Sequence, residues 1–119
     1  MILDQQQISF INENEWVVFA TAGTDAAPRA AIVMPSRVEP DRIIISDVQM
    51  MQSAENVKNN PRVFVSSYKG DTQIKISGAA EYFDAGALFD EIKEFEKTRD
   101  VDVKGIIIVG IQSVEQTDG

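Results

Sequence analysis

Short apolar stretches separated by turn residues predict a mainly β protein. Six stretches have the length and alternation of strands, and they cover Glu15–Ala22, Arg29–Val38, Arg42–Ser46, Arg62–Tyr68, Thr72–Phe83 and Lys104–Glu115. Breaker-rich segments lie between several of them, such as "GTDAAP", "EPD" and "KGD". Gly78, inside the long strand Thr72–Phe83, indicates a β-bulge.

Capping residues predict three short helices between the strands. They are Gln5–Asn14 behind Asp4, a helix that begins at Ser53 and ends before Pro61, and a helix of about Ala85–Thr98 behind Asp84. Helical spacing turns Ile8 and Ile11 of the first helix inward, and places Leu88, Ile92 and Phe95 of the third on one face.

The order of these elements predicts a mainly β fold with short helices, a six-stranded antiparallel split β-barrel. Hairpin-like succession favours a closed or nearly closed barrel, which removes exposed sheet edges. Stretches such as "RIIIS" and "GIIIVG" are apolar on both faces. One face fills the barrel, so helices or another subunit must cover the other, and we expect a homodimer.

Composition narrows the possible functions. The 119 residues fit one domain, 1–119, with a net charge of −8. Such a surface repels phosphate backbones and anionic lipids, so neither a nucleic acid nor a membrane surface is an expected partner. The start "MILDQQQISF" lacks the features of a signal peptide and no stretch is long enough to span a membrane, so we expect a cytoplasmic location.

The chain contains no cysteine and no histidine. Their absence excludes thiolate chemistry, zinc–sulfur sites and Ser-His-Asp catalysis. We therefore predict no catalytic side chain and no metal site, and expect any reactivity to come from a cofactor.

Two places could hold a flat or anionic ligand. Pro35 interrupts a strand and exposes backbone beside Met34 and Ser36, although it could equally protect a sheet edge. The helix start at Gln52 and Ser53 offers backbone N–H groups to an anion, although Ser53 could be an ordinary cap.

The charged and aromatic candidates also have purely structural interpretations. Arg29, Arg37 and Arg42 are the cations closest in sequence to these two places, and each could instead pair with surface carboxylates. The acidic groups of "DEIKEFEK" and "DVD" are predicted to be solvated. Trp16 and the phenylalanines are predicted to be core residues.

The succession of motifs resembles the pyridoxamine 5′-phosphate oxidase-like, FMN-binding split-barrel family. The first half, "VVFATAGTDAAPRAAIVMPSRVEPDRIIISD", follows the strand order of that family. The segments "ENVKNNPRVFVSS", "IKISGAAEYFD" and "VEQTDG" are similar to three later family motifs. The resemblance covers nearly the whole chain in order.

This resemblance implies a small homodimeric flavoprotein with FMN at the subunit interface, acting as an electron carrier or a flavin-dependent oxidoreductase, with a redox partner protein among its expected partners. The implied cofactor-binding residues are Ile32, Val33, Met34, Pro35 and Ser36 on the second strand, and Ser46, Asp47, Met50, Met51, Gln52 and Ser53 around the helix start. The resemblance also implies that C-terminal residues of the other subunit approach the flavin, so Gln116 and Thr117 are weaker candidates.

The chain departs from the family where a lysine or arginine often meets the FMN phosphate. Gln52, Ser53, Ala54 and Glu55 occupy this segment, and Asp47 would add a negative charge. A lost charge-assisted contact costs about 1.5–3 kcal/mol. A second interpretation therefore stays open, a flavin-less barrel dimer that serves as a binding or structural module, and so does a third, a deazaflavin or haem in the same groove.

Overall fold

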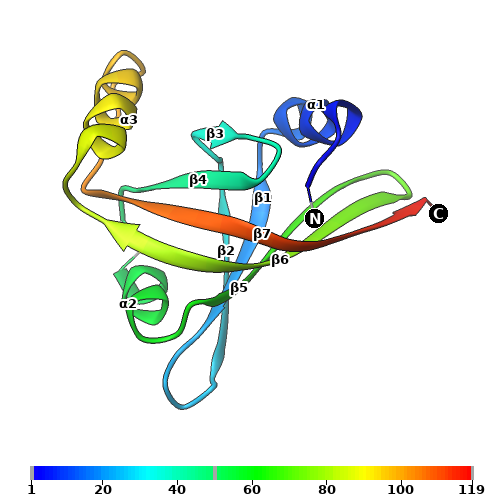
Figure 1. Cartoon of the computed structure of the whole chain (residues 1–119), viewed down its shortest axis with the longest axis horizontal. Helices are drawn as coiled ribbons and strands as arrows, with labels where there is room; N and C mark the ends of the chain where they lie inside the picture. The colour runs from blue at the N-terminus through cyan, green and yellow to red at the C-terminus, as the bar shows by residue number, and fades with distance from the viewer. Residues whose placement is uncertain (1, 50, 119) are drawn as a thin grey trace.

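A single curled sheet dominates the computed structural model, which describes residues 2–49 and 51–118 (Figure 1). Its elements are α1 (Gln5–Asn14), β1 (Val17–Ala22), β2 (Pro28–Val33), β3 (Arg37–Val38), β4 (Arg42–Asp47), α2 (Met51–Asn59), β5 (Arg62–Lys69), β6 (Thr72–Phe83), α3 (Ala87–Lys97) and β7 (Gly105–Asp118). The strands lie in the order β2-β1-β5-β6-β7-β4-β3, and each neighbouring pair is antiparallel.

The sheet forms a split barrel, which confirms the predicted fold class, but it has seven strands where six were predicted. The predicted strand Arg29–Val38 is divided into β2 and β3, the two edge strands of the sheet. Pro35 has no N–H to donate to a strand ladder, so the chain leaves β2 after Val33. It rejoins the sheet where the Ser36 N–H donates to the Ile44 carbonyl at 2.8 Å.

Three predicted element starts were wrong for local reasons. The first strand begins at Val17 because Glu15 ends α1 with a φ of 65°. Helix α2 begins at Met51, so Ser53 lies inside its first turn. Helix α3 begins after Gly86, which makes no side-chain cap, and Asp84 does not cap it. The predicted bulge at Gly78 is confirmed by a register shift between β6 and β7.

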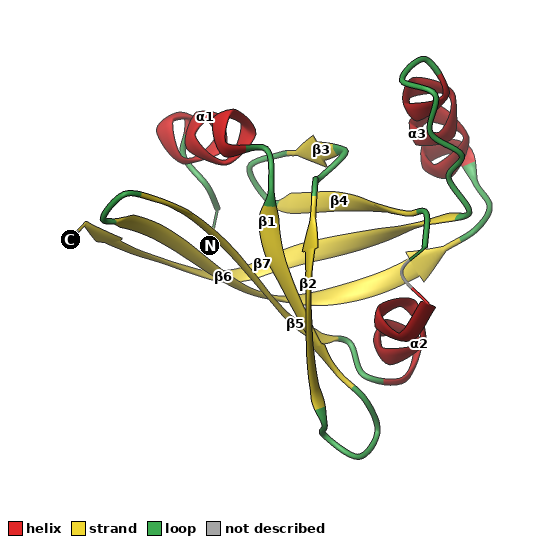
Figure 2. Cartoon of the chain, turned by 180° about the vertical axis from the view of Figure 1, so that it is seen from behind, coloured by secondary structure: helices red, strands yellow, loops and turns green. Residues whose placement is uncertain are grey.

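Two apolar clusters lie on opposite faces of the sheet. The inner cluster fills the barrel with residues such as Phe19, Ile45 and Ile107, each fully buried. The outer cluster packs α3 against β4 and β7 through Ile44, Phe89, Ile92, Val103 and Ile106. Helix α3 lies at one end of β4 and β7 (Figures 1 and 2) and buries part of their second face, which accounts for strand residues that are apolar on both faces there.

The helices differ in how they are anchored. Asp4 and Gln7 form a capping box at α1, and Ile8 and Ile11 are buried as predicted. Helix α2 is tied to β1 by Asn56, whose Nδ2 donates to Thr21 Oγ1 at 3.1 Å. Helix α3 buries Phe89, Ile92 and Glu96, whereas Phe95, predicted to face inward, is 45% exposed.

Within the described residues, no helix has the length and apolar character needed to cross a membrane.

Candidate functional site

A groove of about 440 Å³ lies beside β2 and is lined mainly by apolar side chains. We call it the Trp16 groove. Its strand residues are Arg29, Ala31, Ile32 and Val33 of β2, with Met34 just beyond and Ser46 of β4. Trp16 and Ile32 are 56% and 70% exposed, so Trp16 is not the core residue that the sequence predicted. The groove therefore offers a large apolar surface next to a sheet edge.

Polar groups enter the Trp16 groove from α2 and the segment before it. Val48 and Gln49 line it just before the helix, and Ser53 lines it from the first helical turn. Ser53 is only 2% exposed. The first four N–H groups of a helix have no partner within the helix, so this end of α2 is rich in donors.

A second, polar hollow of about 480 Å³ adjoins the groove, and we call it the amide pocket. Gln52, Asn56 and Asn59 of α2 line it together with the turn that follows β1. Gln52 Nε2 donates to Asn56 Oδ1 at 2.9 Å, which orients both amides. Arg29 lines both the amide pocket and the Trp16 groove.

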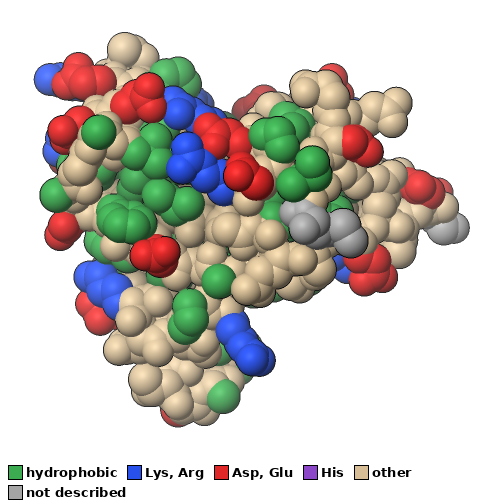
Figure 3. Space-filling model, in the orientation of Figure 1, with side chains coloured by type: hydrophobic (Ala, Val, Ile, Leu, Met, Phe, Trp, Pro, Cys, Tyr) green, Lys and Arg blue, Asp and Glu red, His purple; other side chains and the backbone are tan. Residues whose placement is uncertain are grey.

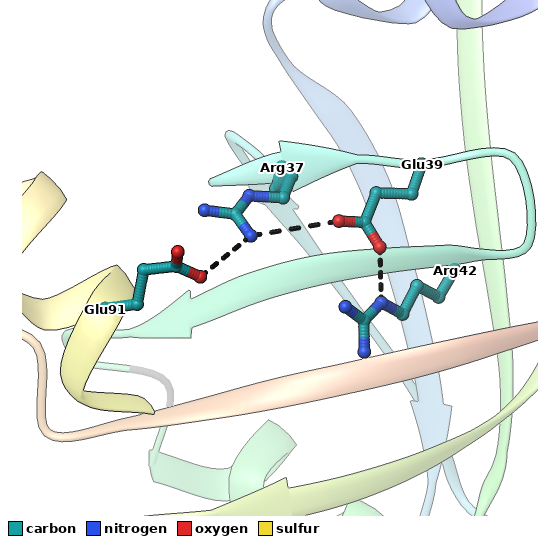
Figure 4. Close-up of polar contacts among 4 residues, drawn as sticks. All are labelled: Arg37, Glu39, Arg42 and Glu91. Atoms are coloured by element: carbon teal, nitrogen blue, oxygen red, sulfur yellow. Dashed lines mark hydrogen bonds and ion pairs between the residues drawn. The ribbon is translucent and has the colours of Figure 1, made fainter. Parts of the chain in front are cut away.

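Arg29 is the one of the three candidate arginines that remains available. Arg37 Nη1 lies 3.0 Å from Glu91 Oε2 of α3 and 3.8 Å from Glu39 Oε2, and Arg42 bonds the same Glu39 (Figure 4). The surface-pairing interpretation is therefore confirmed for Arg37 and Arg42. Arg29 is exposed and forms no ion pair within 2–49 and 51–118. Figure 3 shows how acidic and basic side chains are interspersed on one face of the molecule.

The Trp16 groove also contains a buried carboxylate. Glu96 of α3 lines the groove beside Val101 and is 6% exposed. Its Oε1 accepts from Arg99 Nη1 at 3.1 Å, and Arg99 Nη2 lies 3.6 Å from the sulfur of Met34. The sequence analysis treated this acidic segment as solvated, which is wrong for Glu96.

Asp47 is turned toward a different part of the molecule. Its carboxylate is 7% exposed and accepts from the Tyr82 hydroxyl at 2.6 Å. Burial, followed by this hydrogen bond, raises the pKa of Tyr82. Asp47 itself does not line the Trp16 groove, although Ser46 and Val48 on either side of it do.

The structure brings five of the implied cofactor residues together in the Trp16 groove: Ile32, Val33, Met34, Ser46 and Ser53. Pro35 and Ser36 line a neighbouring hollow of about 250 Å³ with Arg99, and Ser36 Oγ lies 2.5 Å from Ser46 Oγ. Gln52 lies in the amide pocket. Met50 and the side chain of Met51 lie outside the described residues.

Gln116 and Thr117 lie far along β7, where the strand pairs with the start of β6. Gln116 Oε1 accepts from Gln7 of α1 at 3.1 Å. Neither residue lines the groove of its own chain.

Sequence reasoning missed six groove residues: Trp16, Ala31, Val48, Gln49, Glu96 and Val101. For Glu96 a signal existed, because Phe89, Ile92 and Glu96 recur at i, i+3 and i+7, the spacing of one helical face. Trp16 and Val101 join the groove through contacts between distant segments, which no local pattern encodes, whereas Ala31, Val48 and Gln49 are sequence neighbours of residues that were predicted.

Small-molecule sites combine an apolar hollow with a few polar groups, and the split barrel provides this combination in the Trp16 groove, the amide pocket and Arg29. The family model described as pyridoxamine 5′-phosphate oxidase matches residues 3–116. The chain belongs to this family, as its motifs predicted. Among curated proteins, no match was found.

Solved structures share the fold at low sequence identity. HupZ of Group A Streptococcus is 17% identical with a TM-score of 0.90, over 98% of this chain and 95% of that one. An FMN-binding protein of Syntrophomonas wolfei subsp. wolfei is 16% identical with a TM-score of 0.79, over 92% and 82% of the two chains. HutZ, the haem storage protein of Vibrio cholerae, is 12% identical with a TM-score of 0.71, over 98% and 91%.

Proposed function

We propose that this chain is a flavoprotein that binds FMN, with the flavin ring in the Trp16 groove and the phosphate at Arg29 and the start of α2. The observation that carries this proposal is the position of Arg29, which lines both the apolar groove and the polar amide pocket. An amphiphilic ligand with a flat ring and an anionic tail needs that combination. Membership of the family and the likeness to an FMN-binding protein support it.

The donor set suits a phosphate even though residues 52–55 lack a cation. Arg29 can bond a phosphate bidentately, and it breaks no ion pair of the described chain in doing so. Ser53 and the first N–H groups of α2 supply neutral donors. Asp47, whose negative charge could oppose a phosphate, accepts a hydrogen bond from the Tyr82 hydroxyl. The groove volume of about 440 Å³ is within the usual range of ligand pockets.

FMN would supply hydride or single-electron chemistry, and the protein would supply binding and redox tuning. Trp16, Ile32 and Met34 would pack against the ring and exclude water from it. We assign no catalytic side chain. Residues 1–119 would form one such unit, working as an electron carrier or as a flavin-dependent oxidoreductase.

We propose further that two copies of the chain pair over the Trp16 groove. Ile32 is 70% exposed and Trp16 is 56% exposed, and side chains of this kind at a sheet edge favour an interface. Residues of the partner would then complete the site. Sedimentation of wild type and of Ile32→Asp tests this point, and equal monomeric masses for both would refute it.

The proposal is tested by recording the absorption spectrum of the purified protein before and after titration with FMN. We expect saturable binding with flavin absorbance bands. Arg29→Gln should weaken binding about 10- to 100-fold, the effect of losing a hydrogen bond to a charged group. The control is Arg62→Gln, because Arg62 is also exposed and lies outside both hollows.

Two outcomes would replace this proposal. A wild-type protein that binds no FMN at high micromolar concentration, with FMN binding created by Gln52→Lys, would favour the barrel as a binding or structural module that has lost its flavin. Saturable binding of haem in place of FMN would favour the function named for HutZ. The chain lacks histidine, so haem would need another axial ligand.

A further inference from the structure

We propose that Glu96 determines ligand specificity in the Trp16 groove by accepting a hydrogen bond from a ring N–H of the bound heterocycle. For FMN this donor is the imide N3–H of the flavin ring. The inference rests on the proposed function, because it names the group of the ligand that this residue would recognise.

One oxygen of Glu96 is available for this contact. Oε1 accepts from Arg99 Nη1 at 3.1 Å, whereas Oε2 has no hydrogen-bond partner in the described part of the chain. No inaccessible side-chain oxygen or nitrogen of the described residues lacks a partner. Oε2 therefore keeps some accessible surface, and since Glu96 is 6% exposed and lines the groove, we infer that Oε2 faces the groove.

Arg99 fixes where the carboxylate stands. Its guanidinium bridges Glu96 and the sulfur of Met34, at 3.1 and 3.6 Å. Met34 directly follows the end of β2, whereas Arg29 lies near the start of this strand. Five residues of extended chain span about 16 Å. The anion-binding cation and the acceptor carboxylate are therefore placed toward opposite ends of the strand that borders the groove.

The charges of these residues match one kind of ligand. Arg29 attracts an anionic group, and an ionised Glu96 can only accept hydrogen bonds. A ligand with a phosphate at one end and an N–H donor on a ring at the other satisfies both. A ligand that presents a carboxylate to Glu96 would be repelled, which disfavours the propionate groups of haem at that end.

The experiment compares FMN with 3-methyl-FMN, in which a methyl group replaces the imide hydrogen. Dissociation constants are measured by flavin fluorescence for wild type, Glu96→Gln and the control Glu94→Gln. Glu94 is an exposed carboxylate on the same helix and lies outside the groove. We expect wild type and Glu94→Gln to bind 3-methyl-FMN about 10- to 100-fold more weakly than FMN. Glu96→Gln should shrink that ratio several-fold.

The outcomes separate this inference from the proposed function. If wild type binds both flavins equally well, FMN is a ligand but Glu96 does not accept a hydrogen bond from its imide N3–H. The inference then fails while the proposed function stands. If the ratio is large and unchanged in Glu96→Gln, another group contacts N3 and the inference also fails. If neither flavin binds, the proposed function fails and the inference fails with it.

Discussion

Replacing Tyr82 with phenylalanine removes a single hydroxyl group and should lower the free energy of unfolding measurably. That hydroxyl donates to Asp47 Oδ2 at 2.6 Å, and the carboxylate is 7% exposed. A hydrogen bond to a charged group contributes about 1.5–3 kcal/mol. For 119 residues, an unfolding entropy of about 2.1 cal/mol/K per residue makes 1 kcal/mol equal to about 4 °C, so Tm should fall by about 6–12 °C.

The assay is urea unfolding at pH 7 followed by circular dichroism, with thermal unfolding as a second measurement. Tyr68→Phe is the matched control, because Tyr68 is 67% exposed and its hydroxyl bonds no group of the described chain. The control should change the free energy of unfolding by less than about 0.5 kcal/mol. If the two variants are equally stable, the Tyr82–Asp47 bond contributes nothing and the reasoning fails.

The same pair predicts a pH dependence with a definite sign. Burial and then the hydrogen bond to Asp47 raise the pKa of Tyr82 above its ordinary value of 10.0. Above pH 10 the unfolded tyrosine loses its proton while the folded one keeps it, so stability falls as pH rises. This contribution is fully present below pH 10. The difference in stability between wild type and Tyr82→Phe should therefore narrow in alkaline solution, and a constant difference would contradict the assignment.

Three further substitutions test the packing and the site. Ile92→Ala, at a side chain with 0% exposure, should cost about 2–5 kcal/mol in urea unfolding, whereas Phe95→Ala, at an exposed position of the same helix, should cost far less; equal costs would contradict the outer cluster. Gly78→Ala would place a Cβ 2.4 Å from the Gly110 carbonyl oxygen and should cost about 1–3 kcal/mol, which a wild-type unfolding midpoint would refute. Gln52→Lys adds a cation to the pocket that Arg29 lines and should tighten FMN binding about 10-fold in a salt-dependent manner. Unchanged affinity in fluorescence titration would show that the phosphate does not lie in the amide pocket.

Local patterns predicted most of the elements because alternation and turn residues act over a few positions. Helix Gln5–Asn14 and strand Thr72–Phe83 were placed at their observed bounds. Pro35 was recognised as an interruption, yet the prediction still ran one strand through it. The helix caps predicted at Ser53 and Asp84 were wrong because a suitable capping residue permits a cap without requiring one.

The site was harder to predict because distant segments assemble it. Residues near 16, 29–34, 46–53 and 96–101 meet only when the sheet curls and α3 packs against β4 and β7. Alternation identified the β2 residues, but it could not show that Trp16 stays exposed. It could not show either that Arg29 is the arginine left without a carboxylate, since that depends on Glu39 and Glu91 reaching Arg37 and Arg42.

The run of isoleucines in β7 has a consequence for folding fidelity. Ile106 and Ile108 face the outer cluster and Ile107 faces the inner one, so a slip by one residue would exchange identical side chains, and hydrophobicity alone would scarcely oppose the error. Gly105 opposes it instead: a Cβ at its position would lie 2.3 Å from the Tyr82 hydroxyl, so neither Lys104 nor Ile106 can take its place. Gly105, a residue with no side chain, thus selects the observed register of β7 over registers that are shifted by one residue.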